Sequence, residues 1–233
     1  MCGRFKRSLT WAEHRACFGP DSPTPNAPPR YNIAPTDEVY AVRRAGGGGR
    51  ELVALRWGLV PYWSKDRKSA ARNINARAET IDTKPAFREA FARRPCLVLA
   101  DGFYEWRKEG AVRQPYMVTL RDGGPFAFAG LWERWRPAPG SGEVLETCTI
   151  ITTDANRRLR EIHPRMPVIL QPHDHETWLD RDAATARRKL LRPLPEAHLA
   201  VVRVGTRVNS VANDDAGCME PEAPPRRGED LFG

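Results

Sequence analysis

Short runs of apolar residues, several of them alternating with polar residues, follow one another through most of the chain. Runs of this kind, bounded by Gly or Pro, are typical of strands. Two runs at 39–44 and 51–57 flank the glycines at 46–49 and predict a hairpin with a flexible tip. Further strands are predicted at 96–100, 103–107, 115–120, 126–131, 145–152, 167–170 and 199–204.

Helical patterns are shorter and fewer than the strand patterns. Thr10 and Glu13 have the spacing of a capping box, which predicts a helix up to Phe18. A proline at position 85 is placed to begin a second helix, over 85–93. Asp154 is placed to cap a third helix, over 155–160. The last two helices are predicted at 176–179 and 183–191.

The order of these elements decides the fold class. Strands and helices do not alternate regularly, which argues against a doubly wound parallel sheet. We expect an α+β fold: a single domain with a mainly antiparallel, barrel-like β core and peripheral helices. The domain is expected to cover residues 2–219, followed by a disordered C-terminal tail over 220–233. Residues 136–143 are expected to form a long hairpin loop.

The composition fits a globular cytoplasmic protein. The chain has 233 residues, of which 41% are hydrophobic, and this is enough to bury a sizeable core. No apolar run approaches the roughly 20 residues that a membrane helix needs. The first residues have no apolar stretch behind their charges, so we expect no secretory signal and no membrane association.

The charge favours a polyanionic partner. The chain has 37 Lys and Arg against 29 Asp and Glu, a net charge of +8. A basic protein suits nucleic acid, and arginine, which dominates here, binds phosphate bidentately. An arginine-rich chain can equally reflect the composition of a genome, so charge alone does not decide the function.

The cysteines and histidines point to no cofactor. Five cysteines at 2, 17, 96, 148 and 218 form no regular framework and no Cys-x-x-Cys pair, which argues against structural disulfides and a zinc ribbon. The five histidines lack the spacing of metal ligands. We therefore expect no metal and no cofactor.

Cys2 is the first candidate for chemistry. If Met1 is removed, the chain begins with a 1,2-aminothiol whose amine and thiol have pKa values of about 8 and about 8.5. The amine of such a group condenses with an aldehyde to an imine, and the thiol then closes a five-membered thiazolidine. The alternative interpretation is that Cys2 belongs to a frayed terminus without function.

Three further positions are unusual. Asn75 and Arg77 would share one face of an extended segment, although a turn with a surface salt bridge explains them equally well. Glu105 lies between aromatic residues, which would raise its pKa and let it transfer protons, unless it sits on the wet face of an edge strand. His163, beside prolines that fix its loop, is the best general acid or base among the histidines.

Seven segments, taken in order, resemble the SRAP family (SOS-response-associated peptidase). The resemblance covers about residues 2–220. The family implies a single α+β domain with a barrel-like core and a positively charged DNA groove. The segments are 1–5, 30–35, 56–61, 75–80, 96–106, 151–155 and 162–170.

This resemblance implies a function and a set of site residues. The function is covalent capture of abasic sites in single-stranded DNA, including junctions with duplex, with possible lyase activity and removal of Met1. Cys2 would be the crosslinking nucleophile, Asn75 would hold its α-amine, and Glu105 and His163 would transfer protons. We expect a cytoplasmic monomer that is nucleoid-associated when bound to DNA. The residues implied to bind DNA are Gly3, Arg4, Trp63, Arg77 and Thr152, of which Arg4 and Arg77 would contact backbone phosphates.

Two other functions remain open from the sequence. A cysteine peptidase would pair Cys2 with His163 and would need no DNA. A non-catalytic module that binds single strands would keep all its activity after Cys2→Ala.

Overall fold

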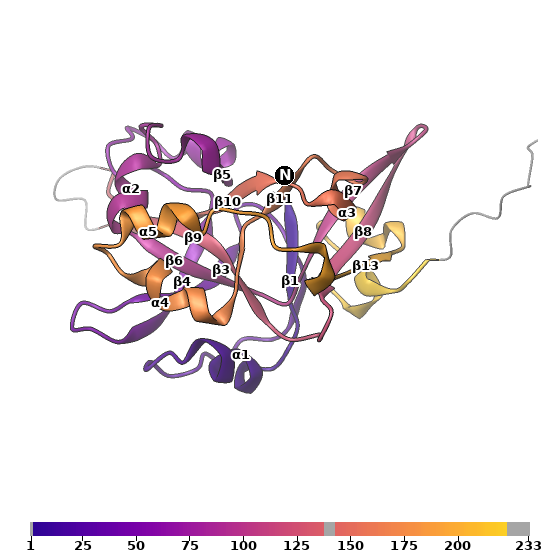
Figure 1. Cartoon of the computed structure of the whole chain (residues 1–233), viewed down its shortest axis with the longest axis horizontal. Coiled ribbons are helices and arrows are strands. Elements are labelled where there is room, and N and C mark those ends of the chain that lie inside the picture. Colours follow the sequence, from indigo (N-terminus) through magenta and orange to yellow (C-terminus); the bar gives the residue numbers. More distant parts are fainter. Residues whose placement is uncertain (1, 138–142, 223–233) are drawn as a thin grey trace, which may run out of the picture.

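A computed structural model describes residues 2–137 and 143–222 of the chain. Its centre is a closed ring of five strands, in which β9 and β10 pair and so complete the circle (Figure 1). Every neighbouring pair in this ring is antiparallel except β4 with β10. The expected barrel-like core is confirmed. The ring strands are β3 (Glu38–Arg44), β4 (Arg50–Trp57), β6 (Pro95–Ala100), β9 (Phe126–Trp135) and β10 (Leu145–Asp154).

Three short strands extend the ring. The strand β5 (Asn75–Arg77) runs parallel to β10, and β11 (Arg165–Pro167) is antiparallel to the same strand. The strand β12 (Ile169–Leu170) pairs with β9. Because β5 and β11 both attach to β10, the Asn75 segment and the segment after His163 are brought to one end of one strand.

A second, fully antiparallel sheet lies against the ring. Its strand order is β13–β8–β7–β1–β2, and the long β7–β8 hairpin projects outward (Figure 1). The first strand of the chain therefore lies inside this sheet, between β7 and β2. The strands are β1 (Arg4–Arg7), β2 (Arg30–Ile33), β7 (Gly102–Glu109), β8 (Val112–Leu120) and β13 (Leu199–Arg203).

Phe5 fastens β1 to the core of the ring. Its side chain is fully buried and meets Trp57 and Phe128 edge-on, with ring centroids 5.2 Å and 5.5 Å apart. Aromatic pairs in this geometry add stabilisation beyond their buried area. Phe5, two residues after Gly3, is thus held by the centre of the molecule.

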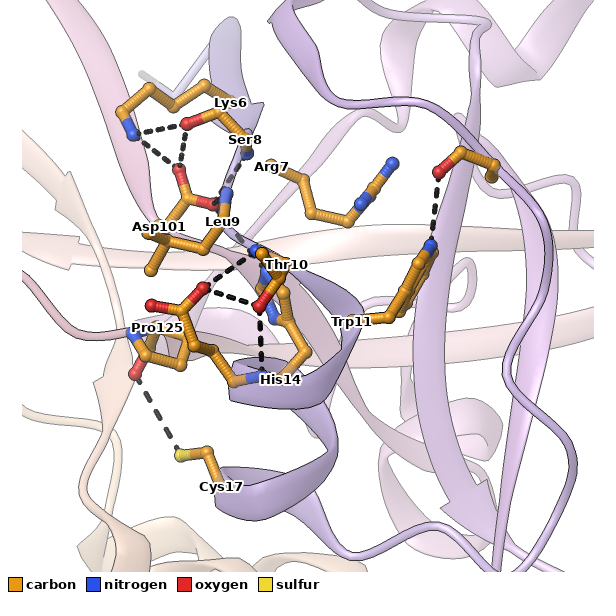
Figure 2. A network of polar contacts seen from close by, with 12 residues as sticks. Lys6, Arg7, Ser8, Leu9, Thr10, Trp11, His14, Cys17, Asp101 and Pro125 are labelled. Atoms are coloured by element: carbon orange, nitrogen blue, oxygen red, sulfur yellow. Dashed lines mark hydrogen bonds and ion pairs between the residues drawn. The ribbon is translucent and has the colours of Figure 1, made fainter.

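A buried carboxylate fixes the chain where β1 ends. Asp101 accepts hydrogen bonds from the backbone N–H groups of Ser8 (2.6 Å) and Leu9 (2.7 Å), and it pairs with the ammonium of Lys6 (Figure 2). His14 Nε2 lies 3.5 Å from its Oδ2. The N–H of Asp101 in turn donates to the carbonyl of Lys6. These contacts lock the register of β1 against β7.

The helices lie outside the two sheets, as expected (Figure 1). The first, α1 (Trp11–Phe18), begins at the predicted capping box of Thr10 and Glu13, which is confirmed. The others are α2 (Arg88–Arg93), α3 (Arg157–Arg160), α4 (His175–Leu179) and α5 (Ala184–Lys189). The 3₁₀ turns are η1 (Lys68–Arg72), η2 (Ala78–Thr80), η3 (Pro172–Asp174), η4 (Glu196–His198), η5 (Thr206–Asn209) and η6 (Ala216–Met219).

Two predicted helix starts are wrong. The helix α2 begins at Arg88 rather than at residue 85, because the chain before it makes separate turns such as Lys84 N–H to Thr80 carbonyl. The cap of α3 is Asn156, whose Oδ1 accepts from the N–H of Leu159 at 2.9 Å. Asp154, the predicted cap, instead continues β10.

The end of the chain differs in part from the expected tail. Glu220–Glu222 still belong to the fold: Pro221 bridges to Val204, and the N–H of Glu222 donates to the carbonyl of Arg203. The remainder of the predicted tail, 223–233, lies outside the described residues, as does 138–142 of the predicted hairpin loop. Among the described residues, no helix is long and apolar enough to span a membrane.

Candidate active site at the N-terminal cysteine

Cys2 is fully buried and is not part of a frayed terminus. Its carbonyl accepts a hydrogen bond from Asn75 Nδ2 at 2.8 Å. The other end of that amide, Asn75 Oδ1, is buried and has no hydrogen-bond partner among the residues that the structure describes. A buried acceptor without a donor is costly and marks a place where a donor belongs. The alternative of a turn with a surface salt bridge is wrong for Asn75.

The position of Asn75 follows from its neighbours. The carbonyl of Ile74 accepts from the Trp57 indole N–H at 2.8 Å and from the Ile150 N–H at 3.1 Å. Asn73 donates from Nδ2 to the carbonyl of Leu59 at 3.0 Å. The polar segment is therefore fixed to the ring on both sides, and the strand alternation turns Asn75 towards Cys2.

Glu105 comes to the same place through the register of β1 and β7. Arg4 pairs with Tyr104, so the next residue of β7, Glu105, follows directly towards the Gly3 and Cys2 end. Strand β7 lies inside its sheet, and Glu105 is only 4% exposed, so it does not sit on the wet face of an edge strand. Burial raises the pKa of Glu105 to about 7.

The Cys2 thiol is held in its protonated form. Burial raises its pKa well above the usual range, and the nearby Glu105 carboxylate raises it further. A thiol in this state attacks an electrophile only if a neighbouring base takes its proton. Glu105, with a pKa near neutrality, is available in both protonation states at pH 7.

His163 occupies the loop between α3 and β11. Its Nδ1 lies 3.0 Å from the backbone nitrogen and 3.1 Å from the backbone oxygen of Arg165, which fixes the ring. Burial lowers the pKa of His163, so the imidazole is neutral at pH 7 and can accept a proton. β11 and β5 are both paired with β10, and they hold this loop and Asn75 at one end of that strand.

The predicted DNA-binding residues fall into two groups. Trp63, 55% exposed, and Arg77, also exposed, present their side chains to solvent, and the side chain of Arg77 makes no hydrogen bond or ion pair with the described residues. Gly3 is half-buried beside Cys2. Thr152, by contrast, is 1% exposed, and its carbonyl accepts from Arg165 Nη2 at 2.7 Å.

Arg4 is already engaged inside the protein. Its Nη1 donates to Asn32 Oδ1 and to the carbonyl of Val208, both at 2.8 Å. Its guanidinium carbon lies 5.9 Å from the ring centroid of Trp106. The sequence analysis missed Asn32, although a polar residue between apolar neighbours in a short run is a signal of this kind of buried partner.

The sequence analysis also missed Arg165. Its Nη1 lies 2.6 Å from Glu79 Oε1 and 2.9 Å from Asp154 Oδ1, and its Nη2 lies 3.0 Å from Glu79 Oε2. The backbone of this arginine contacts His163 Nδ1, so a further cation borders the site. Its position two residues after a candidate histidine, in a loop fixed by prolines, was the available signal.

The chain and its fold have known relatives. The family model described as SOS response associated peptidase (SRAP) matches residues 1–211, and the chain therefore belongs to the SRAP family. An abasic site processing protein of Bacillus subtilis, YoaM, is 40% identical over 95% of this chain and 99% of its own length. The abasic site processing protein HMCES of Gallus gallus is 32% identical over 95% of this chain and 78% of its own.

A solved structure agrees with the fold. A protein of Bacteroides thetaiotaomicron has a TM-score of 0.84 with this chain and is 28% identical to it. The match covers 95% of this chain and all of that one. The predicted family and fold class are thus confirmed.

Proposed function

We propose that this protein processes abasic sites in single-stranded DNA, including junctions with duplex, by forming a covalent thiazolidine through Cys2. The observation that carries the proposal is the pairing of the buried Cys2 with the amide of Asn75 beside a carboxylic acid whose pKa is about 7. The names of the relatives support the class of lesion.

The α-amine is the first reactive group. Removal of Met1 converts the nitrogen of Cys2 from an amide, whose lone pair is delocalised, into an amine. Asn75 Nδ2 holds the adjacent carbonyl, and the unpartnered Asn75 Oδ1 is the natural acceptor for an N–H of the new amine. The amide thus orients the amine with both of its ends.

The reaction balances as a condensation. An abasic deoxyribose must open to its aldehyde, which needs one proton given to the ring oxygen and one taken from the C1 hydroxyl. The amine adds to C1, and loss of water gives the imine. The thiol sulfur then bonds to C1 while its proton passes to the nitrogen. We assign these proton transfers to Glu105 and His163.

The order of steps explains protection. An imine at C1 acidifies the C2 hydrogens, so β-elimination would break the strand and appear as lyase activity. Addition of the thiol removes the imine and protects the strand. Because all site residues come from one chain, we propose that a monomer acts, in the cytoplasm and on the nucleoid.

The electrostatics disfavour the cysteine peptidase. Peptidases of that type activate the cysteine by lowering its pKa next to an imidazolium, whereas the pKa of Cys2 is raised. Autocatalytic removal of Met1 remains part of the proposal, because Glu105 lies close enough to Cys2 to raise the pKa of its thiol.

The test is denaturing electrophoresis of the protein with an abasic oligonucleotide. We expect an adduct that survives denaturation, absent with the intact strand, and one water lighter than the sum of protein and DNA by intact mass. Cys2→Ala and a verified block on the N-terminal amine should each abolish it, because both ring-closing groups belong to one residue. A blocked protein that still forms the adduct at full rate would overturn the mechanism, and a Cys2→Ala protein that keeps all its activity would favour the simple binding module.

A further inference from the structure

Two hairpins of this protein each place two cations directly opposite one another. Lys108 faces Arg113 across β7 and β8, and Arg44 faces Arg50 across β3 and β4. Like charges in directly opposed positions destabilise a sheet. Unless an anion lies near the two cations, their repulsion therefore destabilises the hairpin.

The β3–β4 hairpin contains its own anion. Glu176 of α4 lies between the two arginines and forms ion pairs with both of them, including Arg50 Nε to Oε1 at 3.0 Å. The repulsion between Arg44 and Arg50 is thus relieved inside the fold.

Among the described residues, the β7–β8 hairpin supplies no such anion to Lys108 and Arg113. Lys108 and Arg113 are both exposed, and neither side chain has a hydrogen bond or ion pair within residues 2–137 and 143–222. The neighbouring cations are neutralised: Arg107 Nε lies 2.8 Å and Arg203 Nη1 lies 2.7 Å from the carboxylate of Glu109. Acidic side chains therefore occupy one face of this hairpin and leave the other face positive.

The positive face of the hairpin lies on the side of β7 opposite to Glu105, because residues three apart in a strand point to opposite faces. Lys108 is three residues beyond Glu105 on β7, which is roughly 10 Å of strand. It lies on the same face as Trp106, whose ring carries the guanidinium of Arg4. The hairpin then projects outward from the body of the molecule (Figure 1). Arg4, Lys108 and Arg113 thus lie on one face of the sheet, and Arg4 is two residues from Cys2.

We propose that the end of this hairpin is a DNA arm, in which Lys108 and Arg113 bind backbone phosphates of the strand outside the lesion. This inference rests on the proposed function. One DNA strand carries a phosphate about every 3.4 Å in a duplex, so the arm meets the backbone roughly three nucleotides from the abasic position. A phosphate bound between Lys108 and Arg113 relieves their repulsion, as Glu176 relieves the repulsion in the β3–β4 hairpin.

The test uses the full-length protein and a tetrahydrofuran abasic analogue, which cannot form an imine. Oligonucleotides with two or ten nucleotides on each side of the analogue are compared by fluorescence anisotropy. Lys108→Gln with Arg113→Gln should raise the Kd for the long oligonucleotide about five- to tenfold and reduce its salt slope by about two. Binding of the short oligonucleotide should not change.

The matched control is Arg88→Gln with Lys189→Gln. Both residues are exposed cations on α2 and α5, and their side chains have no hydrogen bond or ion pair among the described residues. These two helices lie on the other side of the molecule from the β7–β8 hairpin (Figure 1). An equal loss of affinity in the control pair, or no loss in the hairpin pair, overturns the arm. Loss of the opposed charges should not lower the melting temperature, so unfolding does not explain a loss of binding.

The outcome is separable from that of the proposed function. The hairpin variant should form the covalent adduct at the parent rate once DNA is saturating, because the arm takes no part in the chemistry. A parent protein that forms no adduct contradicts the proposed function, while the anisotropy comparison still decides the arm.

Discussion

Two buried carboxylates lie four positions apart beside β1, and their pKa values shift in opposite directions. They belong to Asp101 and Glu105. Asp101 is surrounded by donors: the Ser8 and Leu9 N–H groups, the Lys6 ammonium and the His14 ring (Figure 2). Burial alone would raise its pKa, but the His14 and Lys6 contacts outweigh burial and hold the pKa well below the usual range.

For Glu105, at the other end, the effect of burial outweighs that of the contacts that lower its pKa. Burial raises its pKa to about 7. The difference shows that contacts with His14 and Lys6 can outweigh the burial of a carboxylate and keep it ionised. The two carboxylates are thus one fixed anion that holds the strand and one group near Cys2 whose pKa is close to neutrality.

The largest expected effect is on the rate of adduct formation, and it separates the two carboxylates. Glu105→Gln should slow the adduct about 10²- to 10⁴-fold at saturating DNA, because proton transfer contributes this much. His163→Ala should act in the same direction. Asp101→Asn, the matched change at the other end, should react at near the parent rate while it remains folded. Single-turnover electrophoresis measures all three.

Affinity provides the control for this comparison. Glu105→Gln should bind an intact strand as the parent does, whereas Arg77→Ala should bind more weakly and with a shallower salt slope. Equal adduct rates for Glu105→Gln and the parent would remove Glu105 from the mechanism.

The next effect is on stability at the Asp101 end. Asp101→Asn leaves Lys6 buried without its anion, and breaking a buried pair costs about 3–5 kcal/mol. The folded pKa of Asp101 is depressed, so its contribution is present above the unfolded pKa of 3.8 and is lost as the pH falls through the folded pKa. Urea denaturation should show a gap between parent and variant at pH 7 that narrows below pH 4. A constant gap would mean that lost packing, not charge, causes the loss.

The smallest effect is a gain in stability at the Glu105 end. A raised pKa means that the folded state loses stability as the pH rises from the unfolded value of 4.5 to about 7. Glu105→Gln should remove this loss, so the variant should exceed the parent by about 3 kcal/mol or less at pH 8. At pH 4 the two should be equal. A variant less stable than the parent at pH 8 would contradict the raised pKa.

The sequence was most informative where local patterns sufficed. Apolar runs predict the ring strands, and a capping box predicts α1, because both signals involve residues that are neighbours in the chain. The strand β1 was missed, since three of its four residues are charged and nothing local says that Lys6 and Arg7 are buried. The burial of Lys6 is explained by its ion pair with Asp101, which lies far along the sequence.

The candidate site shows the same division. Cys2, Asn75, Glu105 and His163 were identified by residue type and by resemblance. The burial of Glu105, which sets its chemistry, depends on β7 lying between β1 and β8. The hydrogen bond from Arg4 to the carbonyl of Val208 joins residues that lie far apart in the chain. The local sequence around neither residue predicts it.

The internal position of β1 determines when Cys2 becomes buried during synthesis of the chain. Cys2 reaches its buried place only after Asn75 and β7 have left the ribosome, since these provide its contacts. At roughly 5–20 residues per second, about 100 residues take about 5–20 s. For that interval Cys2 is open to a cellular aminopeptidase, and afterwards it is buried. We therefore expect the proposed reaction to tolerate an added sequence at the end of the chain far better than one before Cys2.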